Sequence, residues 1–148
     1  MKVINREVGY AIKSLCFMFL DQGRIVTTSY LASYFHISRP FLRKILQKLN
    51  QAGILESQKG KKGGFKLLVS ANELFLLDVI EIFQGKFQLN SCSTKGYECP
   101  LIDDCLTKRE IEKIEKRLIN DLSGISLKMM IDKNNLLKKE KYNKEETL

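Results

Sequence analysis

Two short amphipathic segments joined by a tight turn constrain the fold of this chain more than any other feature. The spacing of apolar residues predicts a helix that Thr27 or Thr28 caps and that reaches about Phe35. Ser38 caps a second helix, and Pro40 fits its first turn because an N–H there would have no helical partner. The second helix combines an apolar stripe with a basic opposite face. Two short helices in this arrangement form a helix-turn-helix.

A glycine-rich basic turn follows the second helix and predicts a β-hairpin. Residues 54–58 and 65–69 are expected to form two short strands, which are joined by Lys59-Gly60-Lys61-Lys62-Gly63-Gly64. The glycines allow the positive φ angles that a tight turn needs. Because a helix-turn-helix followed by such a hairpin is a winged helix, the expected fold class is mainly α with a small β-hairpin wing (α+β).

Three further helices complete the expected organisation. Residues 5–20 and 72–83 have apolar side chains at helical spacing. A capping box of Thr107 and Glu110 opens a long helix that reaches about residue 131. The expected units are a winged helix-turn-helix domain at 1–85, a cysteine-rich loop at 86–106, a dimerisation helix at 107–131 and a flexible tail at 132–148. The long helix is assigned to dimerisation because one chain has little else to cover its regular apolar stripe.

The positive charge of the chain is concentrated in its first half. The whole chain has a formal net charge of +8, yet residues 1–70 contain twelve Lys and Arg against three Asp and Glu, and residues 71–148 contain thirteen against fourteen. A concentrated basic region favours a polyanion partner such as nucleic acid, although a basic soluble surface is the alternative.

The apolar segments are too short for a membrane span. The sequence has no uncharged apolar run of about 18 residues. Its best candidate, residues 10–20, contains Lys13 and is followed by Asp21-Gln22-Gly23, not by a small-residue cleavage site. We therefore expect a cytoplasmic protein with no membrane partner.

The second helix and the basic turn carry the side chains expected to bind double-stranded DNA. A recognition helix needs long donors near its N-terminus, where it enters the major groove. Arg is the commonest reader of guanine, and lysines on a tight turn suit phosphate or the minor groove. The candidate DNA-binding residues are Ser38, Arg39, Pro40, Phe41, Arg43, Lys44, Lys59, Lys61 and Lys62. A solvated helix face is the alternative interpretation of the same pattern.

Three of the four cysteines lie close together in the expected loop. Six residues separate Cys92 from Cys99, and five separate Cys99 from Cys105. Thiolates are soft ligands suited to zinc or iron–sulfur clusters, and this spacing is wider than that of typical zinc pairs. An iron–sulfur cluster is the expected cofactor, with zinc and thiol or disulfide sensing as alternatives. Cys16 lies among apolar residues of the first helix and is expected to be structural.

Together these segments resemble the Rrf-two family of bacterial transcriptional regulators, of the IscR, NsrR and RirA type. The resemblance covers residues 1–131. It rests on Gly9-Tyr10-Ala11-Ile12, on Ile37-Ser38-Arg39-Pro40-Phe41-Leu42, on the segment from Leu49 to Leu55, on the glycine-rich turn, on the cysteine loop and on the long helix. It implies a homodimer in which the long helices pair and cross onto the partner's winged helix. It also implies a 2Fe–2S or 4Fe–4S cluster held by Cys92, Cys99 and Cys105.

The fourth cluster ligand departs from the IscR-like pattern. Those members place a histidine shortly after the third cysteine, where this chain has Leu106-Thr107-Lys108. NsrR-like members can use an acidic residue near the N-terminus of the partner chain, and Glu7 is the nearest such residue here. Rival ligands are Glu98, Asp103, Asp104, solvent and a small thiol.

The function implied is that of a sequence-specific DNA-binding regulator that depends on its cluster. It is expected to be a repressor and not an enzyme. The expected signal is nitric oxide, redox or iron–sulfur status. Two alternatives stay open. One is a cluster-free winged-helix regulator controlled by thiol oxidation or by a protein partner. The other is a small redox or cluster-carrier protein, against which the charge of the first half argues.

Overall fold

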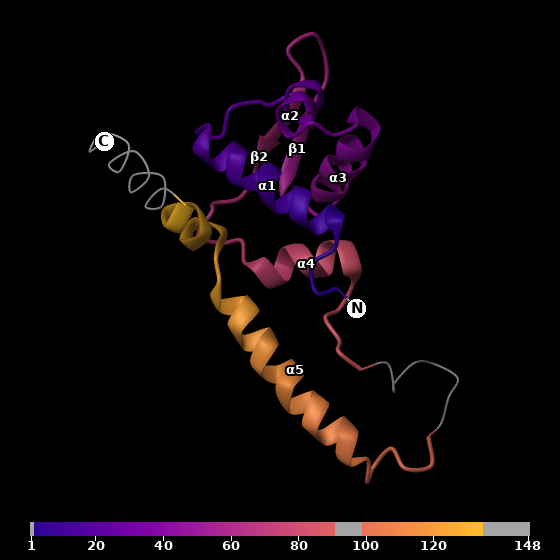
Figure 1. Ribbon diagram of the computed structural model, residues 1–148. Helices are drawn as coiled ribbons and strands as arrows, with labels where there is room; N and C mark the ends of the chain where they lie inside the picture. Colours follow the sequence, from indigo (N-terminus) through magenta and orange to yellow (C-terminus); the bar gives the residue numbers. More distant parts are fainter. Residues whose placement is uncertain (1, 91–98, 135–148) are drawn as a thin grey trace, which may run out of the picture.

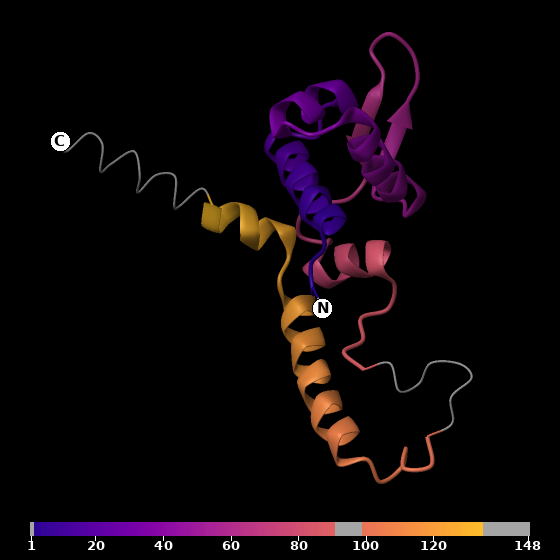
Figure 2. The same ribbon diagram turned by 45° about the vertical axis from the view of Figure 1, so that its right-hand side comes forward.

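A winged-helix unit and a long helix that extends from it make up the protein (Figure 1). The computed structural model describes residues 2–90 and 99–134. Figures 1 and 2 show α1, α2, α3 and the hairpin grouped together, α4 beside them, and α5 running away from α4. The expected α+β fold class is confirmed. Among the helices of the described ranges, none is both long enough and apolar enough to serve as a membrane span.

Helix α1 (Arg6–Leu20) packs one apolar face into the centre of the winged-helix unit. It begins at Asn5, whose side-chain oxygen accepts a 2.8 Å hydrogen bond from a backbone N–H of the first turn. Its buried apolar side chains are Val8, Ala11, Ile12, Leu15 and Met18. Cys16 flanks this face and is half-buried, and burial raises the pKa of its thiol. This position is consistent with the structural role expected for Cys16.

The helix-turn-helix forms as the sequence predicts. Helix α2 (Thr28–Phe35) begins at Thr27, whose hydroxyl accepts a backbone hydrogen bond of 3.1 Å. It ends at His36, which adopts the left-handed conformation with φ of +53° and starts the turn. Helix α3 (Arg39–Gln51) then begins at Ser38, although the Ser38 side chain makes no capping hydrogen bond.

The wing is a two-stranded antiparallel hairpin of β1 (Leu55–Gln58) and β2 (Gly64–Leu67). Gly63 lies so close to the carbonyl oxygen of Gln58 that a Cβ atom at this position would overlap with it. The glycine of the turn is therefore required by the close approach of two backbone segments. Val26, just before α2, adds a bridge to β2 through two backbone hydrogen bonds of 2.9 Å.

The last two helices have limits that differ from those expected. Helix α4 spans Leu76–Gln84, so the start expected at residue 72 was wrong. Helix α5 spans Leu106–Gly124 and does not continue to residue 131. The chain breaks after α5 and enters a further short helix at 127–134. The rest of the expected tail lies outside the described residues.

Both differences have one cause, a short pairing of residues 74–76 with residues 125–127, called the β clamp below. Two backbone hydrogen bonds of 2.9 Å define it, from Leu76 to the carbonyl of Ile125 and from Leu127 to the carbonyl of Leu74. These bonds need extended backbone at the bridged residues Phe75 and Ser126, so α4 cannot extend back through Phe75 and α5 cannot continue through Ser126. The Leu127 side chain is fully buried, which ties the end of α5 to the core.

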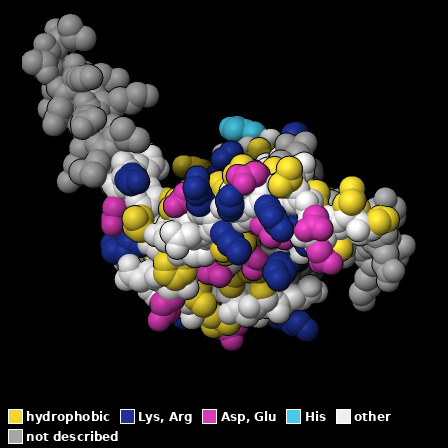
Figure 3. Space-filling view, turned by 90° about the horizontal axis from the view of Figure 1, so that it is seen from below, with side chains coloured by type: hydrophobic (Ala, Val, Ile, Leu, Met, Phe, Trp, Pro, Cys, Tyr) yellow, Lys and Arg dark blue, Asp and Glu magenta, His cyan; other side chains and the backbone are white. Residues whose placement is uncertain are grey.

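Helix α5 has two halves with different surroundings. In its C-terminal half, Leu118, Ile119 and Leu122 pack against the core. In its N-terminal half, Ile114 is 46% exposed and Leu106 is 75% exposed. Figure 3, a view from the α5 side of the molecule, shows Lys, Arg, Asp and Glu side chains interspersed with apolar ones.

Candidate nucleic-acid interface and cysteine loop

A polar groove lies between α3 and the wing. Residues that line it from the helices include Thr28, Arg39, Arg43, Gln47 and Asn50, and those from the wing include Gln58, Lys59 and Lys61. None of the residues that line this groove is Asp or Glu. The groove therefore combines cationic side chains with amide groups that can donate and accept hydrogen bonds.

One face of α3 forms a wall of this groove. Arg39, Arg43, Gln47 and Asn50 follow one another at helical spacings of four, four and three residues, which places them on one face. Gln47 and Asn50 are not among the sequence-based candidates, although the same spacing was available to identify them. Gln and Asn suit adenine as Arg suits guanine. This face therefore presents side chains that can distinguish base pairs.

Two of the candidate residues on α3 face α1 and do not line the groove. The Phe41 ring packs edge-on against Tyr10 with ring centroids 5.9 Å apart, and the Arg6 guanidinium lies 5.0 Å from the Phe41 ring centre. The Lys44 ammonium lies 3.2 Å from a carboxylate oxygen of Glu7. Phe41 is thus an anchor between helices, and Lys44 is paired with an acid.

The remaining candidates are exposed at the edges of the groove. Ser38 and Pro40 are exposed at the start of α3. Lys62 is exposed on the turn of the wing, next to Lys61, but it does not line the groove. The structure therefore brings together four of the nine candidates, namely Arg39, Arg43, Lys59 and Lys61.

Cys99 and Cys105 stand at the two ends of a tight turn that leads into α5. The N–H of Ile102 donates to the carbonyl of Cys99 over 3.1 Å, which closes the first part of the turn. Cys105 caps α5, and its sulfur accepts a 3.4 Å hydrogen bond from the N–H of Lys108. Cys105 therefore takes the capping role that the sequence assigned to Thr107. Both cysteine thiols are free and half-buried.

The chemistry of these donors fits an iron–sulfur cluster in part. Two thiols beside a tight turn supply soft ligands, and a backbone N–H donor at a ligating sulfur is one of the contacts that tune such clusters. Cys92 and Glu98 lie outside the described residues. Within the described part of the chain, no three potential ligands of the His, Cys, Asp and Glu types come together.

The acidic candidates for a fourth ligand lie in two distant places. Asp103 and Asp104 are exposed in the turn between the cysteines. Glu7 lies in the first turn of α1, and Figures 1 and 2 show that this turn belongs to the winged-helix unit, whereas the start of α5 lies at the far end of the protruding helix. Within one chain, the first turn of α1 is therefore remote from Cys99 and Cys105.

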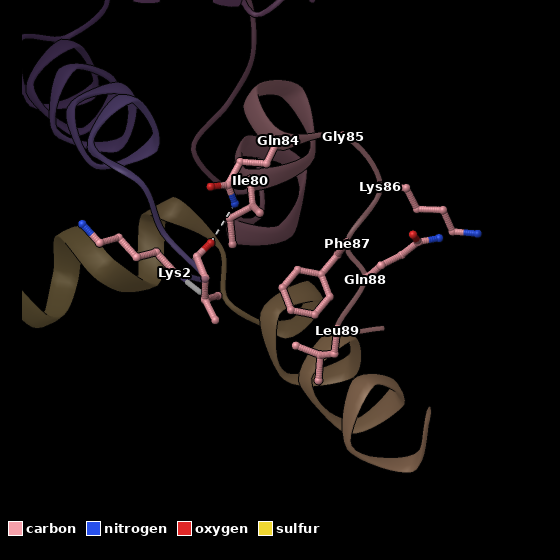
Figure 4. A pocket seen from close by; sticks show the side chains of 9 residues that line it. Lys2, Ile80, Gln84, Gly85, Lys86, Phe87, Gln88 and Leu89 are labelled. Carbon is pink, nitrogen blue, oxygen red and sulfur yellow. Dashed lines mark hydrogen bonds between the residues drawn. The ribbon is translucent and has the colours of Figure 1, made fainter. Parts of the chain in front are cut away.

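The charged side chains at a small pocket next to the end of α4 do not converge on it. Figure 4 shows Lys2 and Lys86 pointing away from it in opposite directions, and the amide of Gln84 donates to a backbone carbonyl over 2.9 Å. Phe87 and Leu89 supply its apolar side. The pocket therefore lies where the segment after α4 meets the N-terminal residues, and its lining does not point to a particular class of ligand.

In this winged helix, α3, which is the second helix of the helix-turn-helix, and the wing border a cationic groove. This is the architecture of DNA-binding transcriptional regulators. Residues 4–133 match the model of the Rrf2 family, which is described as iron-dependent transcriptional regulators. The chain therefore belongs to the Rrf2 family, and its class is that of DNA-binding regulators of transcription. The family description is that of transcriptional regulators, which are not enzymes.

The chain is similar over most of its length to individual relatives and solved structures. Protein aau3 of Rhizobium meliloti (strain 1021) is 28% identical over 125 residues, which are 84% of this chain and 81% of that protein. The structure of T. potens IscR has a TM-score of 0.67 and 23% identity and covers 90% of this chain and 88% of its own. CymR (YrzC), the global cysteine regulator of B. subtilis, has a TM-score of 0.71 and 20% identity over 89% and 98% of the two chains. At these identities, the structural likeness establishes the fold.

Proposed function

We propose that this chain is a dimeric repressor whose affinity for its operator depends on an iron–sulfur cluster in the cysteine loop. The observation that carries this proposal is the placement of Cys99 and Cys105, two free and half-buried thiols beside one tight turn at the start of α5. The description of the family as iron-dependent favours iron over zinc at these ligands. The signal is nitric oxide, redox or iron–sulfur status.

Cys92, Cys99 and Cys105 would hold the cluster. Glu7 of the partner subunit, Asp103 or Asp104 would complete the ligands. When bound, the cluster supplies an iron that nitric oxide or oxygen can attack if its fourth ligand is weak. The chain's own contribution is to hold two thiols at the start of α5 and to donate a backbone N–H to the sulfur of Cys105.

The proposed dimer uses the protruding half of α5. Ile111 and Ile114 lie three residues apart on this half, and Ile114 is 46% exposed. An apolar helix face of this kind is unfavourable in water and pairs readily with the same face of a second copy. Two copies are also what a palindromic operator requires, because recognition helices must enter grooves about 34–36 Å apart.

Within the DNA complex, Arg43 would read a base edge, and Lys59, Lys61 and Lys62 would contact phosphate or the minor groove. The cysteine loop connects to this surface through α5 and the β clamp. The state of the loop would therefore change the angle between each winged-helix unit and the dimer axis. A coupling of about 1.4–2.7 kcal/mol, which is usual for allosteric proteins, corresponds to a 10- to 100-fold change in affinity.

The test compares single cysteine variants on one operator selected from a random-sequence pool. Protein purified without oxygen should be brown, and Cys92→Ala, Cys99→Ala and Cys105→Ala should each be colourless and bind with the weak affinity of cluster-free protein. Cys16→Ala is the matched control and should keep both colour and affinity. Equal affinities of holo protein, apo protein and nitric-oxide-treated protein would refute a sensing role for the loop.

A regulator that senses thiol oxidation without a cluster is the second candidate. The free thiols of Cys99 and Cys105 favour it, as does the structural likeness to CymR, whose title names it a cysteine regulator. It predicts colourless protein whose operator affinity changes with a mild oxidant and returns with a reductant. Anaerobic absorption and Mössbauer spectra separate the two candidates.

A further inference from the structure

We propose that Glu7 is a counter-ion that holds Lys44 of α3 away from DNA and thereby limits the affinity of the protein for DNA of any sequence. The proposal rests on the proposed role of α3 as the recognition helix, but it does not require a cluster. It assigns to the first turn of α1 a part in setting DNA affinity.

The geometry of the pair shows which partner is fixed. Lys44 Nζ lies 3.2 Å from Glu7 Oε1, and 73% of the Lys44 side chain is exposed against 26% of the Glu7 side chain. Glu7 stands in the first turn of α1, where the free N–H groups of the helix end favour a carboxylate. Lys44, on a flexible stem, is therefore drawn toward Glu7, and not the reverse.

This pair is exceptional in the winged-helix unit. Within residues 2–90, Lys44 is the one basic side chain in an ion pair, and the other ion pairs of the described chain lie between residues 104 and 132. Arg39, Arg43 and the wing lysines border the groove without such a partner among these residues. If the pair served only to offset positive charge, there would be no reason for Lys44 to be neutralised while Arg39 and Arg43 on the same helix have no acidic partner among the described residues.

Released from Glu7, Lys44 has a target within its reach. It follows Arg43, which lines the groove, and its side chain leaves the helix one position further round, toward α1. A lysine at the flank of a recognition helix meets the phosphate backbone, where it acts as a point charge without sequence preference. An exposed ion pair adds little to stability, so removing the Glu7 charge should leave the fold intact and expose any effect on binding.

The test measures the salt dependence of binding by full-length Glu7→Gln. Fluorescent duplexes of the selected operator and of a scrambled sequence are titrated over a range of potassium chloride concentrations. Glu7→Gln should bind both duplexes roughly three- to tenfold more tightly at low salt, and the slope of log K against log salt should steepen by about 0.9 for each phosphate gained. The double variant with Lys44→Gln should match Lys44→Gln alone, because the effect passes through Lys44.

The matched control is Asp132→Asn, which removes the same charge from the exposed Lys128–Asp132 pair of the short helix after α5, whose atoms are 3.4 Å apart. It should leave both affinities unchanged. An equal gain in Asp132→Asn would mean a general effect of net charge and would overturn the proposal, as would a gain that persists without Lys44. So would an unchanged slope in Glu7→Gln.

A second background separates this proposal from the cluster ligand considered above. All titrations are repeated with Cys92→Ala. Loss of a ligand predicts an effect only in protein purified with its cluster, whereas loss of a counter-ion predicts the same gain in both backgrounds. An effect confined to the cluster-containing protein would overturn the counter-ion and support Glu7 of the partner subunit as a ligand.

Discussion

At the scale of single residues, the direction in which each side chain leaves α3 decides what it can do. Arg43 and Gln47 face the groove, whereas Phe41 packs against α1. Lys48 turns toward α4, where its ammonium donates to the carbonyl of Phe83 over 3.2 Å. Chemically similar side chains on one short helix therefore face the groove in one case and contact a neighbouring helix in the other.

Arg43→Ala should weaken operator binding and blur base preference at one position of the site. If Arg43 makes a bidentate contact with guanine, the loss is about 1–3 kcal/mol. The measurement is a competition titration with a set of operators, each changed at one base pair. Lys61→Ala is the control, because loss of a phosphate contact should weaken binding to all of them equally. An Arg43→Ala protein with unchanged affinity and preference would show that α3 does not read the operator.

At the scale of elements, the β clamp connects the long helix to the winged-helix unit. Leu127→Ala should destabilise the fold by about 2–5 kcal/mol, because the side chain is fully buried and the space it leaves is lined by packed neighbours. Urea unfolding followed by circular dichroism measures this change. Met129→Ala, in the same short helix but 46% exposed, should cost much less. Similar losses in the two variants would mean that Leu127 does not anchor the clamp.

The same clamp explains which elements were predictable from the sequence. The limits of α1, α2, α3 and the hairpin follow from caps, turns and periodicity, which are all local signals. The start of α4 and the end of α5 were missed because residues 74–76 pair with a segment about fifty positions away, which periodicity cannot show. The ion pair of Lys44 with Glu7 could not be predicted for the same reason, because it joins two helices that are distant in sequence. Gln47 and Asn50, by contrast, follow from helical spacing alone.

At the scale of the whole molecule, the exposed half of α5 should decide the oligomeric state. Ile114→Asp should give folded monomers with weak operator binding, because a charge would be buried at the proposed interface and two half-sites would no longer be bound together. Sedimentation velocity measures the mass, and circular dichroism checks the fold. Leu118→Asp is the informative contrast, because Leu118 packs on its own core and its loss should unfold the protein instead. An intact Ile114→Asp dimer would place the interface elsewhere.

Helix α5 is held along its C-terminal half by the β clamp, by the packing of Leu118 and Leu122, and by a 2.7 Å hydrogen bond from the N–H of Leu89 to the carboxylate of Glu115. The free arm therefore runs from Glu115 to Cys105, which at about 1.5 Å per residue is about 15 Å long. A shift of about 2 Å at Cys105 turns such an arm by about 8°. Under the proposed function, a small adjustment around the cysteines would reach the core only as a small rotation. The proposed sensor would then respond to the presence or absence of its whole cofactor more than to a change in a single bond, which favours an on–off response over a graded one.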